Sequence, residues 1–360
     1  MPTARAELVA QWIEQFAPRA PFHALVVEDG GRWVAALPLV RARRCRLLST
    51  AGLPTNEWSP GGELLLDAEA DADAVLDVVM GGIRQLPWPL VWLDYVPLHT
   101  RRWQAFQAAA ARAAMPSDSH PQWQVPVIEV GRDWEACQQR WSKKHRDKMI
   151  KAARRLAEKG CVQFQMQSQL APEEAESRVR QAFDIEDLGW KGEARTAVLR
   201  TAGMLDFFLR QATQLARWGQ LELALLKLDD RPISFVYGLA AKGVSHWLKI
   251  GYDPEYRCST PGQLLQYHML KRFHEEGDRL AIDCVGPLTD ALSKWKPTTY
   301  TMGRLIIAPR RWSGRAALYA CKHWWPTVRR WLGRNKIDGP AETQCPQTPS
   351  EAGERSPALA

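Results

Sequence analysis

The chain lacks the features that define several large classes of protein. No apolar run in its 360 residues approaches the ~20 residues that span a bilayer, and Met1 to Pro21 contains no apolar signal region. The seven cysteines are scattered and show no CxxC spacing, which argues against a disulfide framework and against a zinc site. We therefore expect a cytoplasmic protein with no bound metal and with reduced, structural cysteines.

The signatures of three common enzyme chemistries are also missing. The sequence contains no HExxH, no nucleophile elbow and no P-loop, so it gives no support to metal-dependent hydrolysis, serine hydrolysis or nucleoside triphosphate chemistry. The composition, with 46% hydrophobic and 24% charged residues, is typical of a globular protein. The length suits two domains of roughly 150 residues each and a short tail.

The net charge of +8 is unevenly distributed, because lysine and arginine crowd the segments 143–159 and 310–336. Such clusters attract phosphate groups. The first cluster also carries an apolar stripe at helical spacing, so part of its charge is the solvated face of an amphipathic helix. The stripe consists of Trp141, His145, Met149, Ala152, Ala153 and Leu156.

The two halves of the chain share a layout of hairpin, further short strands, helix and apolar strand. In the first half, a hairpin over 24–39 precedes a helix over 71–85 and a strand over 90–95. In the second half, a hairpin over 223–237 precedes a helix over 261–276 and a strand over 280–285. This repetition predicts two similar α/β domains, with one irregular domain as the alternative.

Composition also suggests where the domains end. The segment near Met115 to Pro126 contains prolines and serines that break regular structure, and we interpret it as the linker. After Asp338 the sequence turns polar and proline-rich, which predicts disorder. The predicted parts are an N-terminal domain (1–120), a C-terminal domain (127–308), a basic, tryptophan-rich helical segment (309–337) and a disordered tail (338–360).

The turn before the helix at 261–276 suits a phosphate. A strand that runs into a Pro-Gly turn and a helix start leaves unpaired backbone N–H groups at the positive end of the helix dipole. We expect Thr260 to be the N-cap and Pro261 the first helical residue. An ordinary connection that binds nothing is the alternative. The residues that would hold a cofactor's pyrophosphate are Ser259, Thr260, Pro261, Gly262 and Gln263.

Several short motifs in the second half are similar to those of a known family. They are Trp141–Arg146, Lys151–Leu156 with Gly160, Gly189–Gly192, Thr196-Ala197, Phe207-Phe208, Pro232-Ile233, Tyr252–Pro254, Ser259 with Pro261-Gly262, Asp283 and Lys294-Trp295. Together they resemble the CelD-like acetyltransferases, the BioF-type branch of the GNAT superfamily. The first half resembles that family's degenerate first domain more loosely. The superfamily's glycine-rich pyrophosphate loop is reduced here to residues 257–262.

The resemblance implies a fold and an activity. The fold would be α/β (α+β), with tandem GNAT-like domains, each a mixed, mostly antiparallel sheet flanked by helices. The activity would be transfer of an acyl group, first of all acetyl from acetyl-CoA, to an amine or hydroxyl on a small molecule or a sugar. Exopolysaccharide or cell-envelope biosynthesis would be the setting. The resemblance implies neither a metal nor a DNA partner.

Direct acyl transfer needs a base for the nucleophile's proton, a donor to the developing oxyanion and an acid for the thiolate. Tyr252 is a candidate acid, and Asp253, Asp187 and Glu186 are candidate bases. The resemblance also points the charge of Lys294 towards the cleft. Each of these residues has a structural alternative, such as a turn residue for Asp253.

Candidate substrate-binding residues lie on one strand and in one short loop. Strand alternation over 246–252 places His246, Leu248 and Ile250 on one face and Trp247 and Lys249 on the other, and either face could meet the substrate. Trp190, which lies between two glycines, could close over a substrate or belong to the core. The predicted substrate-binding set is Trp190, Lys191, His246 and Lys249.

Two other functions fit the same features. Peptidyltransferases of the peptidoglycan cross-bridge type also have two GNAT-like halves, and they take their acyl group from aminoacyl-tRNA. The basic helix at 143–159 would suit an RNA backbone, but the long heptad segment that many of those enzymes carry is missing. The third hypothesis is a non-catalytic partner of an exopolysaccharide synthase.

The segment 310–336 mixes arginine and lysine with tryptophan, which predicts one or two basic amphipathic helices. Such helices lie on anionic membrane surfaces or pack on their own domain, and both alternatives stay open.

Overall fold

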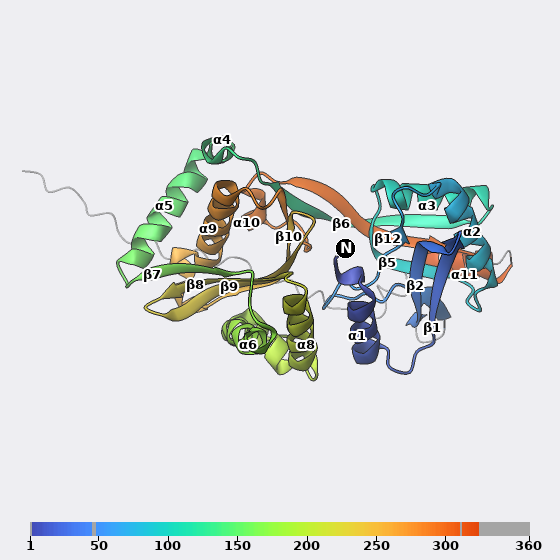
Figure 1. Ribbon diagram of the computed structural model, residues 1–360, viewed down its shortest axis with the longest axis horizontal. Helices are drawn as coiled ribbons and strands as arrows, with labels where there is room; N and C mark the ends of the chain where they lie inside the picture. The colour runs from blue at the N-terminus through green and yellow to red at the C-terminus, as the bar shows by residue number, and fades with distance from the viewer. Residues whose placement is uncertain (1, 45–47, 310–311, 324–360) are drawn as a thin grey trace, which may run out of the picture.

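The computed structural model describes residues 2–44, 48–309 and 312–323, and these residues form one sheet with helices on both faces (Figure 1). Two neighbouring strand pairs are parallel and the others antiparallel. The order across the 12-stranded sheet is β1 (Phe22–Asp29), β2 (Arg32–Arg44), β3 (Leu48–Gly52), β5 (Val91–Pro97), β12 (Thr298–Ile307), β6 (Ser117–Glu129), β11 (Ala281–Asp283), β10 (Val244–Tyr252), β9 (Arg231–Ala241), β8 (Leu221–Leu228) and β7 (Val162–Gln167), with β4 (Leu65–Leu66) beside β2. The parallel pairs are β3 with β5 and β10 with β11.

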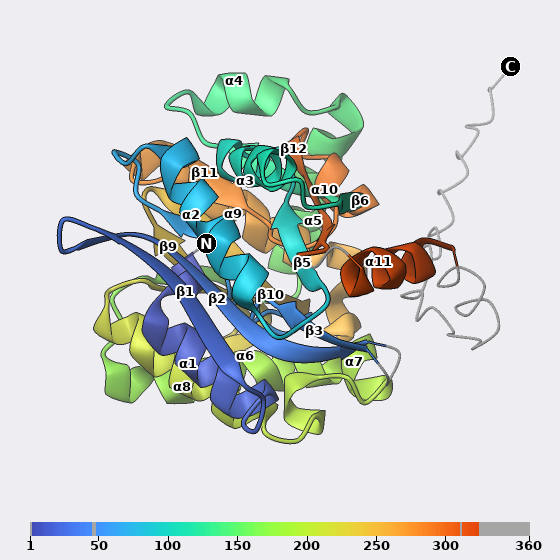
Figure 2. The same cartoon turned by 90° about the vertical axis from the view of Figure 1, so that its right-hand side faces the viewer.

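The first half of the sheet packs against α2 (Ala72–Gln85) and α3 (Arg101–Arg112). Leu37 of β2, Leu93 of β5 and Phe106 of α3 are fully buried in this core. On the opposite face, Leu318 of α11 (Ser313–His323) packs with Trp92 of β5, and Figure 2 shows α11 at the side of the sheet.

The second half is covered on both faces. Helices α5 (Lys143–Ala157) and α9 (Pro261–Glu276) lie on one face, above a core that includes Trp247 and Leu265. Helices α6 (Pro172–Leu188) and α8 (Met204–Arg217) lie on the other face, where Phe183 and Phe208 are fully buried. This mixed, mostly antiparallel sheet flanked by helices confirms the predicted fold class.

Two elements tie the halves together. The N-terminal helix α1 (Ala6–Phe16) packs on α8 of the second half, where the rings of Phe16 and Phe207 lie 5.2 Å apart. Strand β12, late in the sequence, lies between β5 and β6 and runs from one half to the other (Figure 1). The two halves therefore share one continuous sheet.

The segment near 115–126, which we expected to be an irregular linker, forms most of β6, so that prediction is wrong. β12 pairs with β6 over its whole length and supplies partners for its backbone. Pro121 is tolerated because it pairs with Gly303 at the register shift, and bulges accept proline. Strand pairing from a segment far along the sequence therefore outweighs local proline content.

Most other predicted elements of the second half are present. The helix at 261–276 has the predicted ends, and Gly277 stops it with φ 66°. The apolar stripe of α5 buries His145, Met149, Ala152 and Leu156, whereas Ala153 is exposed, in contrast to the prediction. Ala153 follows Ala152 by one residue, which turns it away from the sheet.

The described part of the basic C-terminal segment forms α11, and the remainder, 324–360, lies outside the described residues. Leu318 is buried there, whereas Trp312 is 90% exposed. No helix in the described part of the chain is both long and apolar enough to cross a bilayer. Cys137, Cys161 and Cys284 are free, but Cys258 is disulfide-bonded, so the prediction of reduced cysteines is wrong for that residue. Sequence spacing does not report which cysteines meet in the fold.

The family-like residues Trp141, His145 and Trp295 form one buried aromatic cluster. The imidazole of His145 lies 4.6 Å from the ring of Trp295 and 5.8 Å from that of Trp141. Both ring nitrogens of His145 are buried without a hydrogen-bond partner. Burial, and then the charges of Lys294 and Lys148, lower the pKa of His145 to about 4. The folded protein therefore holds His145 neutral.

Stability should fall as His145 is forced to take up a proton. Its pKa drops from 6.5 to about 4 on folding, so the stabilisation is complete above 6.5 and is lost as the pH falls towards 4. Between pH 7 and pH 4, the wild type should lose up to about 3 kcal/mol more than the His145→Phe variant in urea unfolding. Equal losses in both proteins would contradict the neutral assignment.

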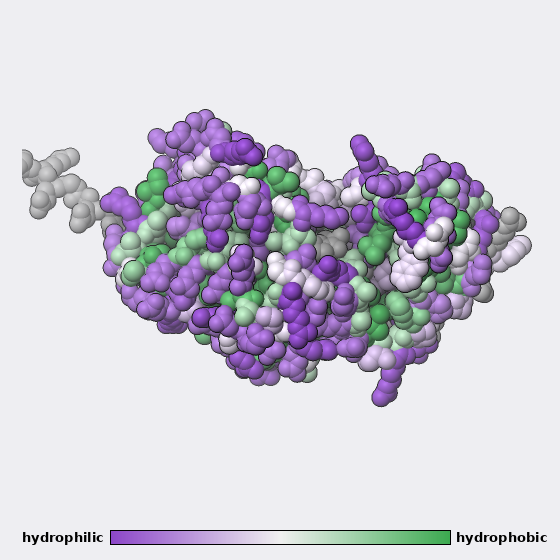
Figure 3. All heavy atoms as spheres, in the orientation of Figure 1, coloured by the Kyte–Doolittle hydropathy of each residue, from purple (hydrophilic) through white to green (hydrophobic). Residues whose placement is uncertain are grey.

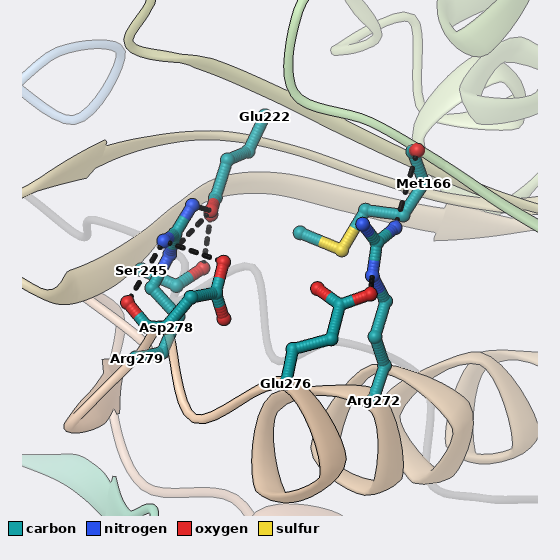
Figure 4. A network of polar contacts seen from close by, with 7 residues as sticks. All are labelled: Met166, Glu222, Ser245, Arg272, Glu276, Asp278 and Arg279. Atoms are coloured by element: carbon teal, nitrogen blue, oxygen red, sulfur yellow. Dashed lines mark hydrogen bonds and ion pairs between the residues drawn. The ribbon is translucent and has the colours of Figure 1, made fainter.

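A buried polar network fixes the start of β10 against its neighbours (Figure 4). Glu222 of β8 accepts hydrogen bonds from Ser245 of β10 and from Arg279, which precedes β11. Arg279 Nη2 lies 2.5 Å from Glu222 Oε1, and the two side chains are 14% and 2% exposed. The network thus joins β8, β10 and the segment that enters β11.

Removal of one partner should be costly because it leaves a buried charge unpaired. Arg279→Met should lower the free energy of unfolding by about 3–5 kcal/mol. The control is Lys271→Met, which breaks the exposed pair of Lys271 with Glu275 and should change stability by about 0.5 kcal/mol or less. Similar small effects of both substitutions in urea unfolding would show that the network is not structurally important.

Candidate acyl-transfer site

β10 and β11 pair over only three residues each and then separate. The pairs join Val244, Ser245 and His246 to Ala281, Ile282 and Asp283. β11 ends there, whereas β10 continues to Tyr252. Among the described residues, the side of β10 from Trp247 to Tyr252 therefore has no neighbouring strand. We call this stretch the open edge of β10; its backbone groups on that side have no sheet partner.

A β-bulge interrupts β10 at the start of its open edge. Trp247 pairs with Gly238 of β9, but Lys249 pairs with Tyr237, so Leu248 has no partner across the strands. A Cβ at Gly238 would lie 2.2 Å from the His246 carbonyl oxygen, which explains the glycine. The bulge makes the predicted alternation wrong, because Trp247 enters the core beneath α9 while Lys249 lies over Phe208 on the other face.

His246 lies where the two strands separate. Its Nδ1 is 3.6 Å from Asp283 Oδ2, and both side chains are largely buried. The Tyr300 hydroxyl donates to Asp283 Oδ2 at 3.2 Å, and the Val285 N–H donates to Oδ1 at 2.8 Å. Burial, and then the charge of Asp283, raise the pKa of Tyr300 far above its usual range, so the hydroxyl keeps its proton. Because Asp283 faces Nδ1, Nε2 is the ring nitrogen left for a substrate proton.

Sequence reasoning selected His246 as a site residue and quoted Asp283 as a motif residue, but it did not pair the two and it missed Tyr300. Asp283 and Tyr300 come from β11 and β12, which are 37 and 54 positions further along the chain. The signals for Asp283 were its place in the family-like motifs and its position at the end of an apolar strand. No spacing pattern links residues on separate strands.

The amino end of α9 contains unsatisfied polar groups. No partner of the Gly262 N–H is found in the described part of the chain. The Thr260 hydroxyl and the side-chain amide oxygen of Gln263 are buried and have no hydrogen-bond partner among the described residues. Thr260 holds a left-handed conformation, with φ 41°, and its side chain does not cap the helix, so the predicted N-cap role is wrong. Of these groups, the Gly262 N–H is the candidate to meet a ligand.

Tyr252 lies beside this helix start. A Cβ on Gly262 would be 3.6 Å from Tyr252 Cδ1, so the predicted residues Tyr252, Ser259, Thr260, Pro261, Gly262 and Gln263 come together in space. Asp253 has a structural role, because its carboxylate pairs with Arg231 at 2.7 Å and accepts the Glu255 N–H. With both oxygens occupied, Asp253 is a poor candidate for a base.

The candidates from α6 and α7 (Trp190–Glu193) are largely engaged with one another. Buried Glu186 accepts from Lys191 Nζ at 2.6 Å and from the Val198 N–H at 2.9 Å. Asp187 binds Arg200 through both of its oxygens, at 2.8 and 2.7 Å. Trp190 is 44% exposed and is therefore not a core residue. Glu186, Lys191 and Asp187 therefore have side-chain partners, whereas the Trp190 side chain makes no hydrogen bond with a described residue.

Lys294 lies apart from the open edge. Its charge acts on His145 of α5, next to the buried Trp295, whose indole N–H donates to Gln266 of α9 at 3.0 Å. The resemblance pointed Lys294 towards the cleft, but its surroundings are those of the α5–α9 core. The structure thus brings Tyr252 together with Gly262, and it places His246 and Lys249 on one strand on either side of the bulge.

Comparison with known proteins identifies the domain that carries this site. Residues 143–296 match the family model described as the acetyltransferase (GNAT) domain, so the chain carries a GNAT acetyltransferase domain. None of the curated proteins compared with the chain matches it in sequence.

Solved structures share the fold at low sequence identity. FemX aligns with a TM-score of 0.54 at 12% identity, over 82% of this chain and 90% of that one. A protein from Agrobacterium fabrum, described as the C-terminal domain of a lysylphosphatidylglycerol synthetase, aligns with a TM-score of 0.51 at 13% identity, over 88% of this chain and 96% of that one. L-PGS from Bacillus licheniformis aligns with a TM-score of 0.50 at 12% identity, over 92% and 98%. These likenesses extend across both halves and show the fold alone.

The left-handed conformation of Thr260 should make that residue replaceable by glycine. A β-branched residue at positive φ is strained by about 1–2 kcal/mol, so Thr260→Gly should raise the free energy of unfolding by roughly 1 kcal/mol. The control is Thr289→Gly at the start of α10 (Asp290–Ser293), where the hydroxyl does cap Leu292 N, and it should lower stability by a few tenths of a kcal/mol. A loss of stability in Thr260→Gly would contradict the strain.

Proposed function

We propose that the protein is an acyltransferase that takes an acyl group, first of all acetyl, from acyl-CoA and transfers it to an amine or hydroxyl of a small molecule or sugar. The observation that carries the proposal is the open edge of β10 between two polar sites. His246 lies at one end and the amino end of α9 lies at the other. Five residues, which include the bulge, separate His246 from Tyr252, and the paired stretch of β9 from Leu239 to Ser234 spans roughly 17 Å.

That spacing suits a donor with a thioester at one end and a pyrophosphate at the other. The Gly262 N–H is a donor for a phosphate oxygen, and the dipole of α9 adds a favourable potential. The donor supplies an activated acyl group. Its carbonyl would lie near the bulge, where the pairing with β9 skips Leu248, and in this proposal the Leu248 N–H donates to the developing oxyanion.

In this proposal the chain's own groups manage the protons at the His246 end. Nε2 of His246 accepts the proton of the acceptor's nucleophile, while Asp283 stabilises the resulting imidazolium through Nδ1. Tyr300 and the Val285 N–H hold Asp283 in place. Tyr252 lies at the pyrophosphate end, so the role of acid for the thiolate, which we expected of Tyr252, moves to the His246 imidazolium.

The resemblance to CelD-like acetyltransferases supports a sugar acceptor in exopolysaccharide or cell-envelope synthesis. We further propose a cytoplasmic site of action, with the basic segment 310–336 in contact with the surface of anionic membranes. The exposed Trp312, just before α11, supports such a contact, because tryptophan favours the membrane interface.

A second donor, aminoacyl-tRNA, is favoured by one observation. Several exposed cations of α5 make no ion pair within the described part of the chain, namely Lys143, Lys144, Lys151, Arg154 and Arg155. α5 contacts η3 (Pro254–Ser259), which leads into α9, and Lys159 lies over the Tyr256 ring at 5.3 Å. The surface over α5 is largely hydrophilic, with patches of hydrophobic residues between (Figure 3). An RNA backbone could follow these cations to the same site.

Thermal unfolding in the presence of acetyl-CoA distinguishes the two proposed donors, acyl-CoA and aminoacyl-tRNA. Acetyl-CoA at about 100 times its dissociation constant should stabilise the protein by about 2.7 kcal/mol, visible as a higher unfolding temperature. Gly262→Leu should abolish the shift, because the added side chain covers the helix start. Its Cβ meets only Tyr252 and Ser234, at 3.6 and 3.9 Å, so the variant should fold.

The control for this substitution is Gly81→Leu, a helical glycine of α2 with open space around it, and this variant should keep the shift. If no acyl-CoA shifts the unfolding temperature at millimolar concentration, the acyl-CoA proposal fails. Steeply salt-dependent binding of aminoacyl-tRNA would then support the second donor.

A further inference from the structure

Lys249 occupies an unusual position between the two halves of the molecule. It lies three residues beyond His246 on β10, and the bulge turns its side chain towards α8. Its ammonium group lies 4.6 Å from the centroid of the Trp58 ring and 5.2 Å from that of Phe208. Trp58 comes from the segment between β3 and β4 in the first half, and Phe208 comes from the second half. The amine is therefore enclosed by aromatic walls from both.

No carboxylate neutralises this amine. Lys249 makes no ion pair with any described residue, although it is partly buried. The charged groups that act on it are Lys191 of α7, Glu186 of α6 and Glu57 beside Trp58. Glu186 already holds Lys191 and the Val198 N–H, and Glu57 is solvent-exposed. Burial first, and then Lys191, lower the pKa of Lys249 to about 8.

Burial of a cation in such a place costs free energy unless an anion pairs with it. Ammonium groups removed from water are normally paired, and aromatic faces compensate only part of the lost hydration. The Nζ atom is not among the buried atoms that lack a partner, so it is accessible to a ligand. The strand spacing places it about 10 Å along β10 from His246, on the side where α6 and α7 lie.

We propose that Lys249 binds an anionic group of the acyl acceptor, a carboxylate or a phosphate, and so selects acceptors that carry a negative charge some atoms away from the nucleophile. This inference rests on the proposed function, because it places the nucleophile at His246. Because Trp58 forms one wall around Lys249, the first half of the chain takes part in the choice of acceptor. Lys191 adds a second positive charge near the same place, held by Glu186.

Anion binding can be measured without any transfer reaction. Inorganic phosphate and acetate, each compared with chloride at constant ionic strength, should raise the unfolding temperature of the wild type at pH 7. The effect should fade as the pH rises through about 8, because the neutral amine does not attract an anion. A larger effect of phosphate would favour a phosphorylated acceptor, and a larger effect of acetate a carboxylic acid.

Lys249→Met tests the residue while it preserves the volume between the two rings. The variant should fold at least as stably as the wild type, because it removes a desolvated charge. Its anion-dependent shift should be smaller than that of the wild type, because only binding at the amino end of α9 remains. The control is Lys227→Met on β8, which is partly exposed and remote from Trp58, and it should keep the shift. An equal anion effect in wild type and Lys249→Met, or no effect in either, would overturn the inference.

Acyl transfer from acetyl-CoA gives the second readout. Matched acceptors, such as glucosamine with glucosamine 6-phosphate and an amino acid with its amide, differ mainly in one anionic group. The wild type should prefer the anionic member of a pair by about 10- to 100-fold in kcat/KM, and Lys249→Met should lose that preference. Transfer without any preference for anionic acceptors would overturn the inference and leave the proposed function standing. If the anion shifts depend on Lys249 but no acyl transfer is found, the proposed function fails and the anion site at Lys249 stands.

Discussion

The site depends on one constraint, the separation of β10 from β11 after three paired residues. Within a sheet, each strand normally satisfies the backbone groups of its neighbour on both sides, and an interior strand with one open side needs another partner. Here the open edge begins where His246 meets Asp283 and ends beside the amino terminus of α9. The network of Glu222, Ser245 and Arg279 fixes the last paired residues, so it determines where the separation starts.

Strained backbone conformations gather at the two ends of this edge. Val285, two residues after Asp283, has φ 57°, and Thr260, directly before α9, has φ 41°. Both are β-branched, and such residues rarely adopt positive φ. Val285 in this conformation directs its N–H to Asp283, and Thr260 leaves its hydroxyl without a protein partner. Strain of this kind persists where surrounding structure enforces it, and it is common at functional sites.

Local patterns predicted the elements well, and long-range contacts explain the errors. The helix at 261–276, the hairpins and the turn before α9 follow from periodicity and from proline and glycine, which act within a few residues. The identity of β6 depends on β12, which is 170 positions or more away in the sequence, and local proline content misled the prediction. The side of the sheet on which Lys249 lies depends on a bulge, which a strict two-residue alternation cannot predict.

The candidate site was predicted only in part, for the same reason. Residues close together in sequence, Ser259 to Gln263, were found as a group. The partners of His246 come from two other strands, and the engagement of Asp253 with Arg231 and of Asp187 with Arg200 could be seen only in the fold. The motif residues Trp141, His145 and Trp295 prove to be packing residues of one core, which a motif cannot distinguish from a binding site.

The most direct test of the central claim is a crystal structure of the protein with coenzyme A. We predict the pyrophosphate at the amino end of α9, within hydrogen-bond distance of the Gly262 N–H, and the thiol near the His246 end of the open edge. Coenzyme A bound elsewhere, or with its thiol away from His246, would contradict the claim that the separation of β10 from β11 creates the acyl-transfer site.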